Sequence, residues 1–204
     1  MKESRIMFKG NQKTSNSTEK RSQNTFIAKE IEIIGDFKGV GSIQVEGTLH
    51  GNVEVTSVVI GENGTINGTI TATNVIVNGK LNGSVFCDSL EVMPNGNISN
   101  DIKVKQLLVS GRVEGEIDSK SEIVIDKTGN VNATTIKSKT ILVNGVFKGK
   151  VTATELLEIG STGSVEGEII VKNIKTHEGG KLLGSMSNYI AETEAELFTD
   201  IKKA

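Results

Sequence analysis

Two histidines are the residues of this chain best suited to acid–base or metal chemistry, and they lie far apart. His50 and His177 are separated by more than a hundred residues of repetitive sequence, so we expect them in different parts of the fold. A shared catalytic or metal site would require both rings within a few ångströms of each other. His50 also falls in a recurring column of polar residues, which indicates a solvated surface.

Carboxylates form the second candidate for chemistry. They occur two residues apart, as Glu114 with Glu116 and Glu166 with Glu168. Such pairs could in principle form the acid and nucleophile of a glycosidase. However, Lys148 and Lys150 occupy the same columns one repeat before Glu166. We therefore predict ion pairs between neighbouring repeats, each contributing a few tenths of a kcal/mol.

The remaining candidates also favour structure over catalysis. Phrases such as "GENGTINGT" are glycine-rich but lack the Gly-Lys-Ser ending of a phosphate-binding loop, so we expect no nucleotide. No cluster of metal-ligand residues occurs, and we expect no cofactor. Cys87 shares a column with Val55, Ala72 and Val104, which predicts a small core residue. The sequence therefore indicates no catalytic residue and no enzyme.

A repeat organises all of these residues. Near-copies of one phrase, among them "VEGTLHGNV", "VNGKLNGSV", "VSGRVEGEI" and "VNGVFKGKV", recur at intervals of 15 to 18 residues. Each phrase contains one glycine of the series Gly47, Gly64, Gly79, Gly96, Gly111, Gly129, Gly145, Gly163 and Gly180. An apolar residue follows two positions after every one of them. The chain is therefore a repeat protein.

Three further columns have the same regularity. One runs Val53, Ile70, Val85, Ile102, Ile117, Thr135, Val151, Ile169 and Met186, with Thr135 as its polar exception. Two more begin at Val58 and Ile60. Apolar and polar residues alternate throughout, which predicts strands.

These columns predict one all-β domain, a parallel β-helix. A repeat of 15 to 18 residues is too short for a helix plus a strand, but it can wrap once around a triangular core. Strands spaced about 4.8 Å apart would then stack coil on coil, and nine coils would make a rod roughly 40 Å long. Glycines that share the parity of the core residues are expected at the corners.

Composition agrees with a narrow core and bounds the location. Aromatic residues make up 3% of the chain, tryptophan is absent, and the net charge is −2, so we expect no nucleic-acid partner. No apolar run approaches the roughly 18 residues that span a bilayer, and no signal peptide is recognisable. We expect a cytoplasmic protein.

The chain divides into three parts. Residues 1–30 carry seven basic and three acidic side chains with few apolar ones, which predicts a disordered basic tail. The β-helix is expected over residues 31–186, with a shortened first coil. Residues 187–204 have Ile190, Leu197 and Ile201 at helical spacing, which leaves open a short helix or a frayed tail.

The repeat domain resembles the bactofilins, polymer-forming bacterial cytoskeletal proteins. The resemblance rests on the entry "IGDFKG", the "V-x-G-x-h-x-G-x-h" phrases and the variants "IGENGTINGTI" and "IGSTGSVEGEI". It implies a right-handed β-helix that assembles end to end into filaments without nucleotide. The resemblance further implies that the filaments act as membrane-associated scaffolds for cell shape, envelope assembly or motility. Asn100 and Ala133 stand where the family usually has glycine.

The resemblance also assigns candidate interaction residues. Phe37 in the first coil, with Leu182 and Met186 in the last, would have a coil neighbour on one side only and is expected to contact another subunit. "MFKGNQK" is similar to the family's membrane-targeting segment. Met7 and Phe8 are therefore expected to contact the cytoplasmic membrane surface, assisted by nearby basic residues.

Two other classes fit less well. Left-handed β-helix acyltransferases also repeat an isoleucine-glycine phrase, but they need a strict six-residue period and a histidine in a trimeric site. A surface-binding β-helix, such as an ice-binding protein or an adhesin, needs a flat threonine ladder or a secretion signal. Neither pattern is present in this sequence.

Overall fold

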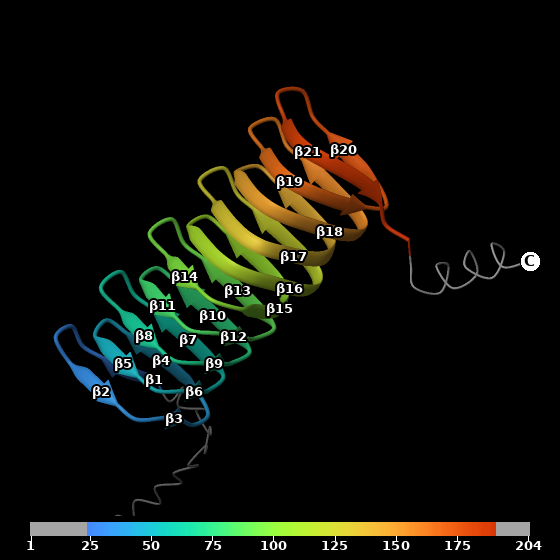
Figure 1. Ribbon diagram of the computed structural model, residues 1–204. Coiled ribbons are helices and arrows are strands. Elements are labelled where there is room, and N and C mark those ends of the chain that lie inside the picture. The colour runs from blue at the N-terminus through green and yellow to red at the C-terminus, as the bar shows by residue number, and fades with distance from the viewer. Residues whose placement is uncertain (1–23, 191–204) are drawn as a thin grey trace, which may run out of the picture.

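The chain forms a parallel β-solenoid of about ten turns, and Figure 1 shows these turns stacked into a rod. The computed structural model describes residues 24–190, and within that range every regular element is a strand. Each turn has three sides, which we call A, B and C in chain order. The first coil starts at Asn24 and the tenth ends near Asn188. The predicted all-β fold is confirmed.

In the first coils each side is a separate short strand. Side A consists of β1 (Asn24–Ile27), β4 (Ser42–Val45), β7 (Ser57–Ile60), β10 (Asn74–Val77) and β13 (Ser89–Val92). Side B consists of β2 (Glu32–Ile34), β5 (Thr48–His50), β8 (Thr65–Asn67), β11 (Lys80–Asn82) and β14 (Asn97–Ser99). Side C consists of β3 (Phe37–Lys38), β6 (Val53–Glu54), β9 (Ile70–Thr71) and β12 (Val85–Phe86).

In the later coils longer strands bend around the corners. They are β15 (Ile102–Val109), β16 (Arg112–Ile125), β17 (Asn130–Val143), β18 (Val146–Ile159) and β19 (Ser164–Val171). The tenth coil consists of β20 (Ile174–Thr176) on side A and β21 (Lys181–Asn188) on sides B and C.

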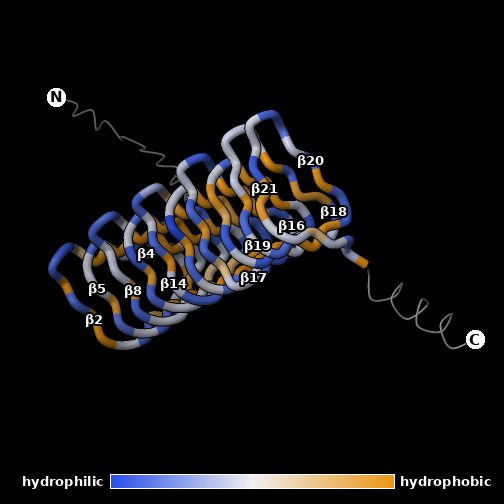
Figure 2. Tube along the Cα trace, turned by 45° about the horizontal axis from the view of Figure 1, so that its top comes forward, coloured by the Kyte–Doolittle hydropathy of each residue, from blue (hydrophilic) through white to orange (hydrophobic). Residues whose placement is uncertain are grey.

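Every strand pairs in parallel with the strand one coil away, and this register aligns the core columns. Leu49, for example, lies between Ile33 and Ile66 and is completely buried. The inward side chains form one continuous apolar tube, and Figure 2 shows the resulting alternation of hydrophobic and hydrophilic residues along the coils. The tube is closely packed because each side chain contacts its equivalents above and below.

The prediction that Thr135 occupies the core column is wrong by one residue, because Ile136 occupies it instead. Thr135 pairs with Glu116 and is only partly buried, whereas Ile136 pairs with Ile117 and is completely buried. The register shifts between Ala133 and Thr135 because this coil contains an extra residue at the corner. The polar exception in the core column therefore disappears.

The glycines act through two different constraints. At Gly64 an added Cβ would lie 2.1 Å from the carbonyl oxygen of Val45 in the preceding coil, so no larger side chain fits. Gly115 has a φ of +130°, in the region that glycine favours. Asn100, one coil earlier in the same column, adopts a φ of 107° as a non-glycine residue. Ala133 occupies the same column one coil after Gly115, where the extra residue changes the course of the backbone at the corner.

The ends of the rod differ from the predicted boundaries. Strand β1 pairs with β4 from Asn24 to Ile27, so the first coil is complete and begins seven residues before position 31. The predicted tail therefore overlaps the solenoid at residues 24–30. The short helix or frayed tail predicted for residues 187–204 falls mainly on residues outside the described range. Within that range no helix is long and apolar enough to cross a bilayer.

Candidate polymerisation surfaces

The N-terminal end of the rod has strands that pair on one side only. Strands β1, β2 and β3 pair with β4, β5 and β6, and no other described strand pairs with them. Phe37 lies there, in register with Val53, and it is partly buried against the core. Apolar side chains are also unusually exposed in this coil, with 82% of Ile34 and 81% of Val40 accessible.

The C-terminal end has the same character. Strand β20 pairs only with β18 and β21 only with β19 among the described strands. Leu182 continues the core column of Val165 and is partly buried, whereas Met186 continues the column of Ile169 and is 58% exposed. Both side chains therefore lie where the next coil of the tube would begin.

The two ends together can support stacking of one rod on another. Among residues 24–190 the end strands have no partner strand on their outer side, and the backbone N–H and C=O groups of such edges pair readily with another chain. A second subunit would extend both the hydrogen-bond ladder and the apolar tube. The structure thus places the three predicted residues at the ends, but their contact with another subunit remains a prediction.

Sequence reasoning missed part of these end surfaces. Exposed apolar residues at outward positions of the end coils include Phe26, Ile34, Val40 and Leu183. The available signal was an apolar residue in a column that is otherwise polar, as at Ile34 and Leu183, which are in register with His50 and Glu166. Phe26 precedes residue 31, where the β-helix was expected to begin, so the sequence places it in the tail and not on the end coil.

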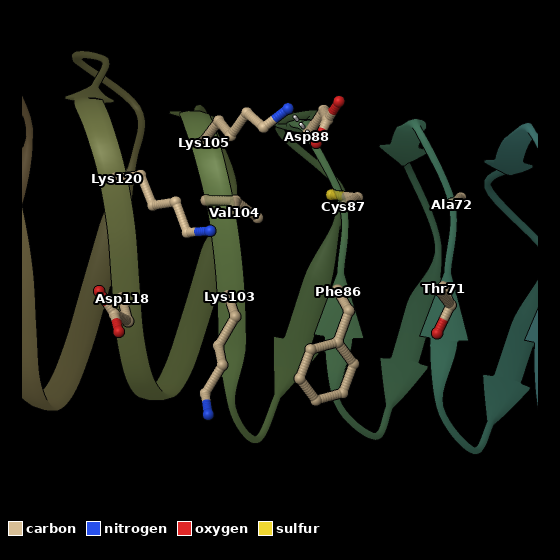
Figure 3. Close-up of a pocket in the computed structure, with 10 residues that line it drawn as sticks. All are labelled: Thr71, Ala72, Phe86, Cys87, Asp88, Lys103, Val104, Lys105, Asp118 and Lys120. Atoms are coloured by element: carbon tan, nitrogen blue, oxygen red, sulfur yellow. Dashed lines mark ion pairs between the residues drawn. The ribbon is translucent and has the colours of Figure 1, made fainter.

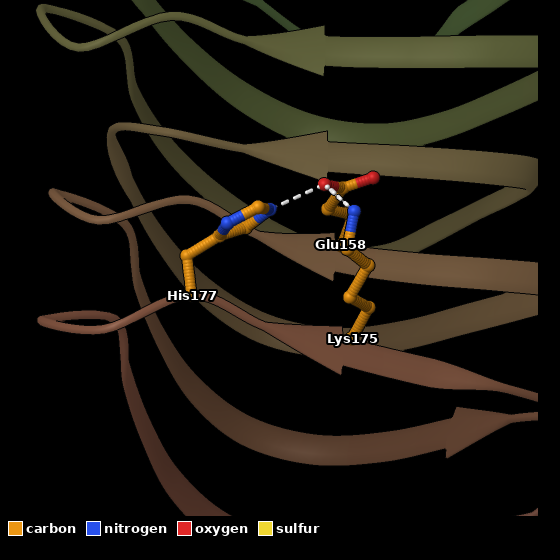
Figure 4. Close-up of polar contacts among 3 residues, drawn as sticks. All are labelled: Glu158, Lys175 and His177. Carbon is orange, nitrogen blue, oxygen red and sulfur yellow. Dashed lines mark hydrogen bonds and ion pairs between the residues drawn. The ribbon is translucent and has the colours of Figure 1, made fainter.

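The histidines occupy separate ion-pair clusters in the second and tenth coils. His50 Nε2 lies 3.2 Å from Glu32 Oε1, and its Nδ1 lies 3.3 Å from the side-chain Nδ2 of Asn67. His177 and Lys175 both contact the carboxylate of Glu158, as Figure 4 shows. The hydrogen bond from His177, followed by that from Lys175, lowers the pKa of Glu158.

The predicted ion pairs between coils are present. Lys148 Nζ lies 2.9 Å from Glu166 Oε2, and Lys150 Nζ lies 3.2 Å from Glu168 Oε1. These carboxylates are therefore neutralised by lysines of the preceding coil. In residues 24–190 no group of three or more histidine, cysteine or acidic side chains could hold a metal ion.

Cys87 lines a shallow pocket of about 420 Å³ on side C, shown in Figure 3. Its side chain packs against the edge of the core beside Ala72 and is only partly buried, whereas the sequence predicts a core residue. Burial, followed by the charge of Asp88, raises the pKa of the thiol to about 12. The thiolate that nucleophilic chemistry requires is therefore strongly disfavoured.

The predicted membrane contacts cannot be placed. Met7 and Phe8 lie outside the described residues 24–190.

Comparison with protein-family models gives two overlapping matches to one model. Residues 25–110 and 104–187 both match the model named Bactofilin and described as polymer-forming cytoskeletal. No curated protein matches the chain, and no solved structure matches it. The double match follows from the repeat, because successive groups of coils have similar sequences.

Proposed function

The chain belongs to the bactofilin family of polymer-forming cytoskeletal proteins, and from this we propose that its rods stack end to end into filaments without nucleotide. These filaments serve as a cytoplasmic scaffold at the membrane surface, for cell shape, envelope assembly or motility. The observation that supports the proposal most directly is the pair of open ends. Each one combines strand edges that no other strand of the described residues pairs with and apolar side chains in the core columns.

The energetics of stacking favour assembly without a chemical energy source. A second rod placed on the first would repeat the contact that already joins neighbouring coils. Burying one apolar side chain such as Met186 contributes about 1.5–3 kcal/mol, and several would be buried together with the strand edges. No step in this association requires hydrolysis of a nucleotide.

The filament is proposed to be non-polar. Like ends would meet, N-terminal with N-terminal and C-terminal with C-terminal, so that each contact is isologous. This arrangement has two different interfaces that alternate along the filament.

Purified protein imaged by negative-stain electron microscopy without nucleotide tests the assembly. We expect long filaments from the parent chain, and no long filaments from Phe37→Lys or Leu182→Lys, because a lysine would bring an unpaired charge into the contact. Asn132→Lys is the matched control. Asn132 is exposed in the middle of the rod between Glu114 and Lys148, and this variant should form filaments like the parent. Long filaments from both end variants would show that assembly uses the sides of the rod.

Membrane contact through Met7 and Phe8 is a separate part of the proposal. A short apolar segment with basic neighbours gives weak and reversible binding to anionic lipid, about 1 kcal/mol for each basic side chain near the surface. Co-sedimentation with anionic vesicles should be lost in the variant Met7→Glu/Phe8→Glu, while filaments persist. Equal sedimentation of parent and variant would remove the membrane role.

A further inference from the structure

Side A has an outward-facing apolar strip in its C-terminal half. Leu108, Val124 and Leu142 are stacked in register in the sixth, seventh and eighth coils, and Leu156 lies beside them in the ninth. Leu108 is 37% exposed, and the other three are partly exposed. The strip borders a shallow hollow of about 290 Å³ that is also lined by Glu122. An outward column of a solvated sheet normally carries polar residues, so this strip indicates a covered surface.

Lysines line the corner that separates side C from this strip. Lys105, Lys120 and Lys139 lie at the corner in successive coils, just before the side A strand begins, and Lys172 follows at the ninth coil. Lys105 pairs with Asp88 at 2.8 Å and Lys139 is 4.0 Å from Glu155. Lys120 and Lys172 form no ion pair with any residue in 24–190. Lys120 lies between Lys105 and Lys139, and a further acidic residue at this corner would relieve the repulsion among the three stacked charges.

The chain leaves the last coil at the same corner. The backbone N–H of Tyr189 donates to the carbonyl oxygen of Val171, which places Tyr189 beside Lys172. Ile190 follows and is 52% exposed. In Figure 1 the described chain ends near β18 and β20, the strands that form side A of the last two coils.

The fourteen residues after Ile190 match this surface in sequence. Their acidic side chains come first, at Glu192, Glu194, Glu196 and Asp200, and two lysines follow at Lys202 and Lys203. The large apolar residues are Leu197, Phe198 and Ile201. Fourteen residues span about 21 Å as a helix and more when extended. The distance from the tenth coil back to the sixth is about 19 Å. The segment is therefore long enough to cover the strip.

We propose that residues 191–204 fold back along side A of their own rod and cover the strip formed by Leu108, Val124, Leu142 and Leu156. Leu197, Phe198 and Ile201 contact the strip, the acidic residues face the corner lysines, and Lys202 with Lys203 approach Glu122. This contact goes beyond end-to-end assembly and does not depend on it. It leaves the C-terminal end coil free and keeps an apolar face from joining filaments sideways.

A single tryptophan reports this contact, because the chain has none of its own. Residue 198 lies eight residues past Ile190, which is about 12 Å along a helix. Because coils are about 4.8 Å apart, a tryptophan there would lie two or three coils before the tenth, beside the strip. In Phe198→Trp we expect emission shifted to shorter wavelength, compared with a synthetic peptide of residues 190–204 that carries the same tryptophan. Emission identical to that of the peptide would refute the contact.

Variants of the strip then locate the contact. Adding Val124→Lys/Leu142→Lys to Phe198→Trp should return the emission to that of the free peptide. The matched control is Val59→Lys/Ile76→Lys, which changes the same outward column of side A in the third and fourth coils and should leave the emission shifted. Lys120→Glu/Lys139→Glu keeps every apolar group and should also reduce the shift. Circular dichroism confirms that each variant keeps its β structure, and an unchanged shift in both strip and lysine variants overturns the proposal.

A mixing experiment distinguishes the chain's own rod from a second copy. The Phe198→Trp chain with the altered strip is mixed with an excess of chain that ends at Ile190 and has an intact strip. We expect the emission to stay like that of the peptide, because the segment contacts its own rod. Recovery of the shift would mean that a second copy accepts the segment, which would overturn the assignment to the same rod.

Discussion

Val113 lies between Ile98 and Val131 in the neighbouring coils and is completely buried. Its neighbour Glu114 faces the opposite way and is exposed. Val113 thus lies in the apolar tube and the adjacent Glu114 lies in solvent. The effect of a substitution on stability therefore depends on which of these two surroundings the side chain faces. The ionisable group of Cys87 at the tube wall shows the same effect, since partial burial, followed by the charge of Asp88, raises its pKa.

We predict that Val113→Asp unfolds the rod or lowers its stability by about 4 kcal/mol or more, because an unpaired charge would enter the tube. The matched control is Glu114→Asp, which alters the exposed neighbour and should change stability by less than about 0.5 kcal/mol. Thermal or denaturant unfolding followed by circular dichroism measures both. Similar unfolding of parent and Val113→Asp would mean that this column is not core.

We predict that Cys87 reacts very slowly with thiol reagents in the folded protein. Its pKa of about 12 leaves little thiolate at pH 8, and we expect alkylation at least about 100-fold slower than after unfolding. The raised pKa also means that the folded state disfavours the thiolate. The contribution of Cys87 to the free energy of unfolding therefore depends on pH. It is fully present below the pKa of the unfolded thiol, near 8.5, and is lost as pH rises toward 12. Equal alkylation rates in native and denatured protein would contradict the burial.

At the level of the strands, the sequence predicted the type and stacking of the elements but not every register. The columns beginning at Leu49 and Val58 were assigned correctly because apolar alternation reports directly on which face is buried. The core position of Ile136 was not predicted because an extra residue at the preceding corner moves the core residue one place further along the chain. The column was defined by a fixed number of residues after each glycine, and a fixed number cannot account for an inserted residue. The predicted end residues lie at the ends, whereas their contact with a second copy of the chain stays a prediction, because the periodicity within one chain reports only on contacts between its own coils.

Glycines with different surroundings give a test of the corners. Gly64→Ala should destabilise the rod by about 1–3 kcal/mol, because the new Cβ would lie 2.1 Å from the carbonyl oxygen of Val45. Gly39→Ala is the control, since nothing lies within 4 Å of its added Cβ and its stability should be nearly unchanged. Denaturant midpoints compare the two, and equal midpoints would show that the coils separate easily at Gly64.

At the scale of the whole molecule, the rod has two different ends, and this predicts discrete products when one end is blocked. If like ends meet, Phe37→Lys leaves the C-terminal ends able to pair and should give dimers. Leu182→Lys should give dimers through the N-terminal ends, and the double variant should give monomers. Sedimentation velocity separates these species. Monomers from either single variant would instead indicate head-to-tail contacts, in which each interface uses both ends.

The strict parallel stacking of the ten coils also has a consequence for how such a chain can change its length during evolution. Duplicating one interior turn would insert 15 to 18 residues, lengthen the rod by about 4.8 Å and leave both terminal coils unaltered. Losing one side of a turn would instead interrupt a core column, whereas a single extra residue at a corner, as before Thr135, leaves the later columns aligned. Rods of this type are therefore expected to diverge in whole turns, so that subunit length can vary while the ends remain compatible.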